Sequence, residues 1–414
     1  MNDKPASSGG WPSNLPALSG SDAAEIAESD HAAGFEISDA FEPFKQRNDL
    51  FNRAFWDPSI ATDHAEGFFN SYRMRSIPRR GDGFTQKDFA LRNAAWSLAD
   101  AIADRSMADG VREGFLDPLK PHGERAPEQV PVDDPAAMSQ EIKRIAQLFG
   151  ADIAGVTAFD PRWLYASRVD CRDFSEKPND LPPGLTSVIV LGHGMELDLV
   201  DTYPSALAGT AVGLGYSGEA ATAIKLANYI RNLGYEAVAS MNDTALVIPL
   251  AIKAGLGEYG RNQMVITEEF GPRVRFSKIF TDLPLTHDRP KRFGVSEFCA
   301  ICRRCADACP VSALPYGPPT EAGPNHSSIK GVKKWTADCE KCFGYWTKLK
   351  SDCAICLRVC PYNKDFSRPV MRLAQRLAGT RLRKMILWLD TALGHGGRTT
   401  PKSWWQNLAH RPRH

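Results

Sequence analysis

The cysteines of this chain gather in one stretch, residues 299–360, which holds nine of the ten that the sequence contains. The first run, FCAICRRCADACP, spaces four of them as C-x2-C-x2-C-x3-C-P. This spacing is typical of segments that wrap a [4Fe–4S] cluster, and the cysteine before proline commonly ligates a second cluster. A second run, DCAICLRVCP, ends in the same cysteine–proline pair. The stretch therefore predicts two [4Fe–4S] clusters.

The two runs predict two sets of four ligands. One set is Cys299, Cys302, Cys305 and Cys360, and the other is Cys309, Cys342, Cys353 and Cys356. Cys339 is the alternative to Cys342. Zinc and disulfides are the competing interpretations. Zinc sites favour isolated cysteine pairs with histidine, and neither run contains histidine. Disulfides are typical of small proteins in oxidising compartments.

Composition indicates a globular protein of two or three domains, with 414 residues of which 43% are hydrophobic and 24% charged. The formal net charge of +1 gives no reason to expect a nucleic-acid partner. No apolar run approaches the length of a membrane span. The N-terminus, MNDKPASSGGWPSNLP, shows neither a secretory nor a twin-arginine pattern. A reducing cytoplasm is the predicted location, with peripheral membrane attachment as the alternative.

Hydrophobic periodicity predicts an α/β (α+β) body framed by other segments. Residues 86–105, 136–149, 218–234 and 246–257 are predicted helices, and residues 152–159, 186–192, 235–240, 262–271 and 274–283 are predicted strands. The predicted organisation is an N-terminal region (1–135, partly mobile), an α/β domain (136–290), a ferredoxin-like domain (291–365) and a basic helical tail (366–414).

The segment Gly213-Leu-Gly215-Tyr-Ser-Gly218 fits G-x-G-x-x-G and precedes a predicted helix. A dinucleotide-binding fingerprint also needs a strand directly before it and an acidic residue about 20 positions later. The preceding residues, DTYPSALAGTAV, make a poor strand. The glycines are predicted instead to let the backbone approach a large planar ligand.

Residues 186–365 resemble the cobalamin- and iron–sulfur-dependent reductive dehalogenases and, more distantly, the epoxyqueuosine reductases. The resemblance is carried by GLGYSGEAATAIKLANYIRNLGYEAVASMNDTA, AGLGEYGRNQMVITEEFGPRVRFSKIFTDLPL, FGVSEFCAICRRCADACP and KCFGYWTKLKSDCAICLRVCPYNK. It implies a nitroreductase-like domain that holds a base-off cobalamin, with a two-[4Fe–4S] ferredoxin-like domain docked against it. No D-x-H-x-x-G segment, which would supply a lower histidine ligand to cobalt, occurs in the chain.

The same resemblance implies an active site. Tyr216 matches the proton donor, Asn242 the amide beside it, and Arg275 the cation that polarises the phenol. A nearby guanidinium favours an ionised phenol, so Arg275 is expected to lower the pKa of Tyr216. Lys278 is the alternative cation. The predicted cobalamin-binding residues are Gly213, Gly215, Gly218, Ser240, Met241, Gly257 and Arg261.

The implied function is cobalamin-dependent reductive removal of halide from a small organohalide, with electrons from an external ferredoxin or flavodoxin-type reductase. One alternative is an epoxyqueuosine reductase-like enzyme, although the R-D-Y-H motif of that family is missing. Another is a non-catalytic iron–sulfur protein that reduces the corrinoid of a partner. The tail, with ten Lys or Arg in residues 365–414 against Asp365 and Asp390, is predicted either to dock on an acidic partner or membrane surface or to close the core.

Overall fold

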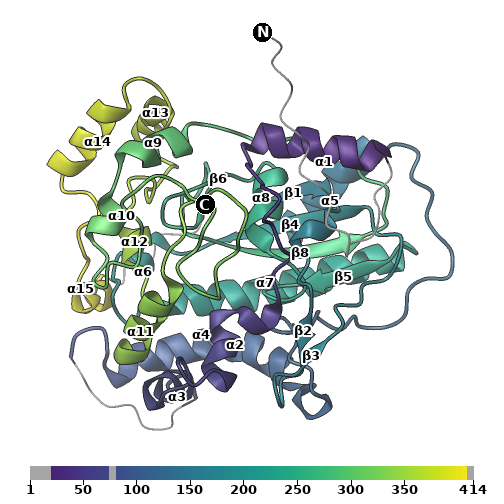
Figure 1. Ribbon diagram of the computed structural model, residues 1–414, viewed down its shortest axis with the longest axis horizontal. Coiled ribbons are helices and arrows are strands. Elements are labelled where there is room, and N and C mark those ends of the chain that lie inside the picture. The colour runs from purple at the N-terminus through teal and green to yellow at the C-terminus, as the bar shows by residue number, and fades with distance from the viewer. Residues whose placement is uncertain (1–19, 74–80, 408–414) are drawn as a thin grey trace.

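The computed structural model describes residues 20–73 and 81–407, and only the backbone of residues 20–22. A four-stranded sheet lies at its centre (Figure 1). The inner strands are β4 (Ser187–Gly194) and β8 (Val274–Thr281), flanked by β1 (Ile153–Ala158) and β5 (Ala237–Ser240). Every pairing between neighbours in this sheet is antiparallel. The predicted element types are thus present, in an antiparallel arrangement.

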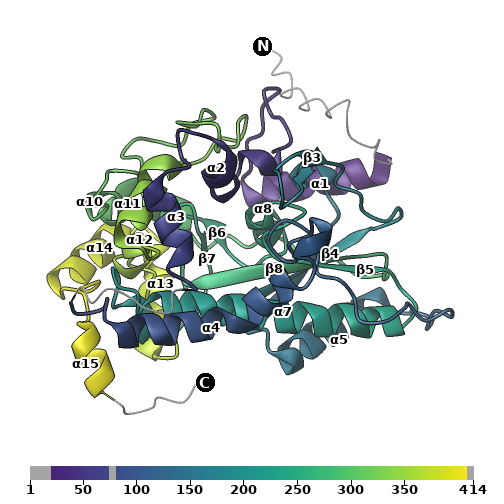
Figure 2. The same ribbon diagram turned by 90° about the horizontal axis from the view of Figure 1, so that it is seen from below.

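Helices cover both faces of the sheet. Side chains alternate along β4, so that Ile189 and Leu191 pack toward one face while Val188 and Val190 pack toward the other. The first face is covered by α7 (Gly209–Asn232), α4 (Gln86–Asp104) and α5 (Pro135–Phe149), which form one layer in Figure 2. On the second face lie α8 (Val247–Lys253) and α1 (Gly20–Ala33).

Local signals fix the ends of these helices. Thr85 and Asp88 form a reciprocal capping box at the start of α4. Asp134 caps α5, whose first residue is proline. The chain leaves α7 through Gly234, which has φ of 87° and so adopts the left-handed conformation that glycine tolerates best.

The cysteine-rich segment forms a separate group of short helices beside this body. They are α9 (Val295–Ile301), α10 (Arg304–Asp307), α11 (Cys339–Leu349) and α12 (Ile355–Arg358). The N-terminal helices α2 (Leu50–Trp56) and α3 (Asp63–Asn70) pack on α11. The predicted N-terminal region is therefore shared between the two parts, because α4 packs on α7 while α2 and α3 pack on α11.

The remaining described elements are short or lie at the C-terminal end. They are α6 (Leu197–Val200), β2 (Arg168–Val169), β3 (Glu176–Lys177), β6 (Glu258–Tyr259), β7 (Val265–Ile266), α13 (Pro369–Ala378), α14 (Arg383–Ala392), α15 (Pro401–Gln406) and the single turns Gln46–Asn48, Met107–Asp109 and Pro161–Trp163. Across residues 20–73 and 81–407, no helix has the length and apolar character needed to cross a bilayer.

Two predicted elements need correction. The helix expected to start at residue 218 starts at Gly209, so the glycine motif lies inside α7. The strand expected over 262–271 is reduced to Val265–Ile266, followed by a turn closed between Thr267 and Gly271. The described part of the helical tail contains three helices, α13, α14 and α15. The first two are separated at residues 379–382, where Gly379 packs against the backbone of Phe293.

Candidate functional site

The predicted catalytic residues reach one place from three elements. Tyr216 lies in the second turn of α7, Arg275 is on β8, and Asn242 is the second residue after β5. Because β5 pairs with β8 and α7 crosses the same face of the sheet, residues far apart in sequence meet there.

The geometry around the Tyr216 hydroxyl suits a proton donor. The Asn242 amide donates to the Tyr216 Oη at 2.5 Å. The oxygen thus accepts one hydrogen bond, while its own proton remains available to another acceptor. The Arg275 guanidinium carbon lies 3.5 Å from the centroid of the Tyr216 ring, and its Nη2 lies 3.5 Å from the Asn242 Oδ1. Three residues predicted from sequence are therefore in mutual contact.

Aromatic rings enclose the Tyr216 side chain, which is 9% exposed. The Trp96 ring lies 4.4 Å from the Tyr216 ring between centroids, and the Phe115 ring stacks on it at 5.4 Å. Neither residue was identified as part of a site from sequence. Trp96 lies in a helix pattern that indicates only packing, and Phe115 lies in a segment with no periodicity.

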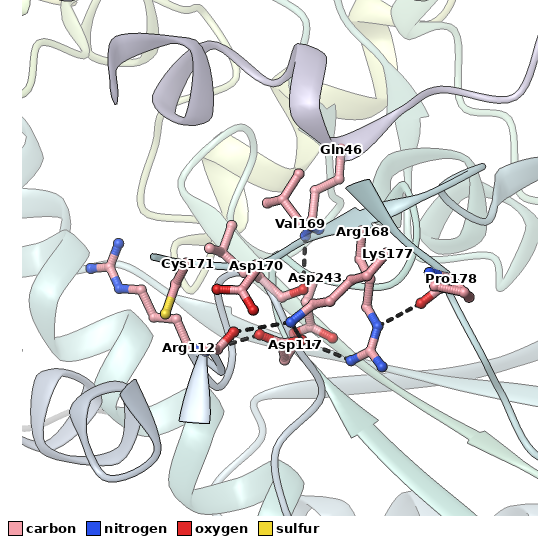
Figure 3. A network of polar contacts seen from close by, with 12 residues as sticks. Gln46, Arg112, Asp117, Arg168, Val169, Asp170, Cys171, Lys177, Pro178 and Asp243 are labelled. Carbon is pink, nitrogen blue, oxygen red and sulfur yellow. Dashed lines mark hydrogen bonds and ion pairs between the residues drawn. The ribbon is translucent and has the colours of Figure 1, made fainter. Parts of the chain in front are cut away.

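A polar network holds the segment that carries Phe115 (Figure 3). Asp117 is 2% exposed in its side chain and accepts from Arg168 at 2.7 Å and from Lys177 at 2.9 Å. Gln46 donates to the Phe115 carbonyl at 3.4 Å. The buried carboxylate and its two cations therefore fix the backbone that supports the ring against Tyr216.

Burial dominates the acidity of Tyr216. It raises the pKa of the phenol above its ordinary value of 10, Arg275 and Asn242 act in the opposite direction, and Glu219 raises it further. Arg275 lowers the pKa of Tyr216, as expected from sequence, but burial outweighs this contribution, because the enclosing rings remove the phenolate from water, and the net shift is upward. Tyr216 accordingly keeps its proton at neutral pH.

Glu219 is a site residue that the sequence analysis missed. Its side chain is fully buried, and its Oε1 accepts from the Arg275 Nε at 3.1 Å. No hydrogen-bond partner is found for its Oε2 among the described residues. Burial raises the pKa of this carboxyl, and Arg275 and Lys278 oppose the rise. The available signal was spacing, since residues three apart on a helix share a face and Glu219 follows Tyr216 at that interval.

Lys278, the alternative cation, binds backbone carbonyls and does not contact Tyr216. Its fully buried ammonium donates to the carbonyls of Met241 at 2.5 Å and Asp243 at 2.9 Å. Burial lowers its pKa to about 8. The cation that contacts Tyr216 is Arg275.

Replacing Glu219 by Gln should move the alkaline limb of the pH–rate profile to lower pH. The carboxylate raises the pKa of Tyr216, so its removal lowers that pKa, and a proton donor at this position would be lost at lower pH. The amide oxygen of Gln can still accept from Arg275, so the neutral-pH rate should fall by less than about ten-fold. Glu219→Leu is the matched variant that removes the acceptor and should cost more. An unchanged alkaline limb in Glu219→Gln would contradict this role.

The glycine motif does not form a ligand-facing loop. A side chain at Gly213 would meet Trp96 and one at Gly215 would meet Arg275, so these glycines admit protein side chains against α7. The prediction that they approach a planar ligand is corrected for both positions. Gly218 is less crowded, with the His193 ring 3.6 Å from the position of a Cβ.

The other predicted cofactor residues are mostly engaged within the protein. Ser240 and Met241 are buried, with the Ser240 hydroxyl donating to the Asp243 carbonyl at 3.0 Å. Arg261 donates through Nε to the Cys299 carbonyl at 3.0 Å and through Nη1 to two further carbonyls, and so fastens the cysteine-rich segment to the body. Gly257 borders a cavity of about 200 Å³ between β1 and residues 291–293.

One predicted set of cysteines lines a common space. Cys299, Cys302, Cys305 and Cys360, the first cysteine group, surround one small cavity, together with Phe298 and Tyr362. Every cysteine is free of disulfide bonds. Among the residues that the structure describes, no group of three or more His, Cys, Asp or Glu could hold a single metal ion. Four cysteine thiols around one cavity are the ligand set that the sequence predicts for one [4Fe–4S] cluster.

The second set also converges. Cys309, Cys353 and Cys356 pack against one buried cluster. Burial raises the pKa of Cys342 to about 12, with smaller contributions from Cys353, Cys309 and Cys339, and Cys356 is influenced by Cys342, Cys353, Cys305 and Cys309. Cys309, Cys342, Cys353 and Cys356 are therefore neighbours. These four residues form the second cysteine group. Cys339 instead donates to the Asn325 Oδ1 at 3.2 Å and packs with the aromatic cluster under α3. The geometry thus favours Cys342 over Cys339 as a member of the group.

Comparison with known proteins identifies similar sequences. Residues 298–363 match the 4Fe-4S double cluster binding domain. The chain is 34% identical over 303 residues to the tetrachloroethene reductive dehalogenase of Dehalobacter restrictus, covering 64% of this chain and 55% of the relative. It is 32% identical over 298 residues to that of Sulfurospirillum multivorans, covering 66% and 60%. The chain thus spans little more than half the length of these relatives.

Solved structures share the fold. The catabolic reductive dehalogenase NpRdhA superposes with a TM-score of 0.68 at 24% identity, covering 88% of this chain and 48% of that one. Its complex with 3-bromo-4-hydroxybenzoic acid gives 0.69 at 23% identity, covering 87% and 47%. An epoxyqueuosine reductase of Cellulophaga algicola is 30% identical over 135 residues, 29% of this chain and 37% of the relative. The resemblance to reductive dehalogenases and, more distantly, to epoxyqueuosine reductases is confirmed.

Proposed function

We propose that this protein is a reductive dehalogenase. The reaction would break a carbon–halogen bond, form a carbon–hydrogen bond with two electrons and one proton, and release halide. The observation that carries the proposal is the Tyr216 hydroxyl, which accepts from Asn242 and lies against Arg275 inside an aromatic enclosure. A protonated phenol with its hydrogen free to donate is the chemistry that the product carbon needs.

The two cysteine groups would supply the electrons. We propose that the first group, Cys299, Cys302, Cys305 and Cys360, ligates one [4Fe–4S] cluster. The second group, Cys309, Cys342, Cys353 and Cys356, would ligate the other. An external donor of the ferredoxin or flavodoxin type would reduce them. The match of residues 298–363 to a double-cluster domain supports this assignment.

Cobalamin is the proposed reaction centre. A structurally similar protein is described as carrying out B12-dependent dehalogenation. Tyr216 and the exposed Asn242 are the residues of this chain that suit the reactive side of such a group. Gly213, Gly215, Ser240 and Met241 do not fit as its direct contacts, since protein atoms already occupy their surroundings, and Arg261 lies at the cavity of the first cysteine group. When bound, reduced cobalamin supplies the low-potential cobalt that cleaves carbon–halogen bonds.

The residues of this chain have separate tasks in the proposed reaction. Tyr216 donates its phenolic proton to the carbon that loses the halogen. Asn242 fixes the orientation of the hydroxyl by donating to its oxygen. Arg275 stabilises the phenolate that remains, and Glu219 holds Arg275 in place. Trp96 and Phe115 exclude water from the same region.

The substrate class is a small organohalide. The named activity of the sequence relatives is directed at tetrachloroethene, and a similar structure was solved with a bromohydroxybenzoic acid. The rings of Trp96 and Phe115 favour a flat or compact apolar molecule over a charged one. The nitroreductase-like description, the domain boundaries at 135, 290 and 365, and a cytoplasmic location remain predictions.

Halide release tests the function. Protein reconstituted with iron, sulfide and cobalamin should release halide from chlorinated or brominated alkenes and phenols when a low-potential reductant is supplied. Omission of cobalamin should abolish release while leaving both clusters reducible. If the protein retains no cobalamin yet transfers electrons to a separate corrinoid protein, the non-catalytic alternative replaces this proposal.

A further inference from the structure

A stripe of large apolar side chains runs along the outer face of α14. It consists of Met385, Trp388 and Leu389 on the helix and of Leu382 and Leu393 at its two ends. Leu382, Trp388 and Leu389 lie three or four residues from Met385, and Leu393 lies four residues after Leu389, so the five fall on one side of the helix. Trp388 is 66% exposed and Leu393 is 69% exposed. On the neighbouring α13, Val370 and Leu373 are exposed in the same way. We call the five residues the α14 stripe.

The opposite face of α14 is fastened to the molecule. Ile386 and Leu387 pack against the buried cluster that contains Cys299, Cys302 and Cys360. Asp390 is nearly buried and forms ion pairs with Arg304 and, at 2.9 Å, with Lys364. The helix therefore has a second, fully formed inner face, and the exposure of the stripe does not result from a loosely attached tail. Figure 1 shows α13 and α14 at the margin of the molecule, outside α9.

Basic residues flank the stripe along the sequence. Residues 366–393 contain a single acidic residue, Asp390, and its carboxylate is already paired with Arg304 and Lys364. The bases of the same segment are Arg368, Arg372, Arg376, Arg381, Arg383 and Lys384. A second copy of this chain would bring like charges together across a two-fold contact, which is unfavourable. A helix with an exposed Leu/Trp face and flanking Lys/Arg matches the pattern of interfacial helices on anionic lipid.

We infer that α13 and α14 form a docking surface for an anionic membrane, with the α14 stripe inserted among the lipid headgroups. The basic residues would contact the negatively charged lipids. Because the inner face of α14 packs on the first cysteine group, docking would place this edge of the cluster-binding segment toward the membrane. The inference is independent of the proposed dehalogenation, since it rests on surface geometry and charge alone.

Vesicle co-sedimentation tests the inference with the full chain. The wild type should sediment with vesicles that contain phosphatidylglycerol, not with pure phosphatidylcholine vesicles, and added salt should weaken the binding. The double variant Trp388→Gln/Leu389→Gln should bind at least roughly ten-fold more weakly, because it removes the largest inserted surface. Arg381→Glu/Lys384→Glu should reduce binding to the anionic vesicles by a similar factor.

Leu148→Gln is the matched control, since Leu148 lies on α5 and is 79% exposed. It should leave vesicle binding unchanged, and iron content should be equal in all variants. Full anionic-vesicle binding by Trp388→Gln/Leu389→Gln would overturn the inference. The inference would also be overturned if the wild type did not bind the vesicles but formed a dimer, and if the same double variant were monomeric. Halide release with a soluble chemical reductant should not change in these variants, which separates a failure here from a failure of the proposed function.

Discussion

Replacing Tyr216 by Phe should lower the rate of dehalogenation by about 10²- to 10⁴-fold, the usual contribution of a general acid. The change removes only the hydroxyl that accepts from Asn242, and the ring can keep its contacts with Trp96 and Phe115. Binding of the substrate should be nearly unchanged, so the loss should appear in kcat. Single-turnover halide release at saturating substrate measures it directly.

Arg275→Leu should act through the same group. Arg275 covers the Tyr216 ring and lowers the pKa of the phenol against the effect of burial, so its loss leaves a weaker acid. The double variant should lose little more activity than the less active single variant, because both changes disable the same proton donor. Cluster and cobalamin contents must match those of the wild type for the comparison to hold. Near-full turnover in Tyr216→Phe would show that another acid or a water donates the proton.

The second large effect concerns the cysteine groups. Cys302→Ala should reduce the iron content from about eight to about four atoms per chain, because one of the two four-iron clusters would be lost. Cys356→Ala should do the same for the other cluster. In both variants turnover with a protein electron donor should fall below detection, because the relay is interrupted. Iron and acid-labile sulfide analysis, with spectra of the reduced protein, provides the measurement.

Two other cysteines supply matched controls. Cys171 lies far in sequence from both groups, near the Met107 carbonyl, and Cys171→Ala should retain the full iron content. Cys339→Ala should also retain it, since the thiol donates to Asn325 and packs among aromatic rings. Loss of about four irons in Cys339→Ala, with normal iron in Cys342→Ala, would reverse the ligand assignment. About four irons in fully reconstituted wild type would contradict the presence of two clusters.

The sequence predicted those parts of the structure that depend on local patterns. The strands β1, β4 and β8 were predicted because continuous apolar runs bounded by turn residues are specific to buried strands. The cysteine spacing predicted two groups, and the structure brings each together. The start of α7 was missed, because three glycines within six residues resemble a loop, and two of them, Gly213 and Gly215, are explained only by Trp96 and Arg275, which are distant in sequence.

The electrostatics of the site could not be predicted in the same way. The direction of the Tyr216 pKa depends on whether burial or Arg275 dominates, and burial is set by Trp96 and Phe115 from unrelated segments. Glu219 was visible as a helix neighbour of Tyr216, but its pairing with Arg275 requires the packing of α7 on β8. The outward direction of the α14 stripe likewise depends on the ion pairs of Asp390.

The most direct test of the central claim is the fate of the substrate carbon in heavy water. Reduced, cobalamin-loaded protein should release one halide per product molecule, and that product should carry one deuterium on the carbon that lost the halogen. Mass spectrometry of the product and ion chromatography of the halide measure both quantities in one reaction. A product that carries a hydroxyl group in place of the halogen, or no halide release from any organohalide with both clusters reduced and cobalamin bound, would contradict the account.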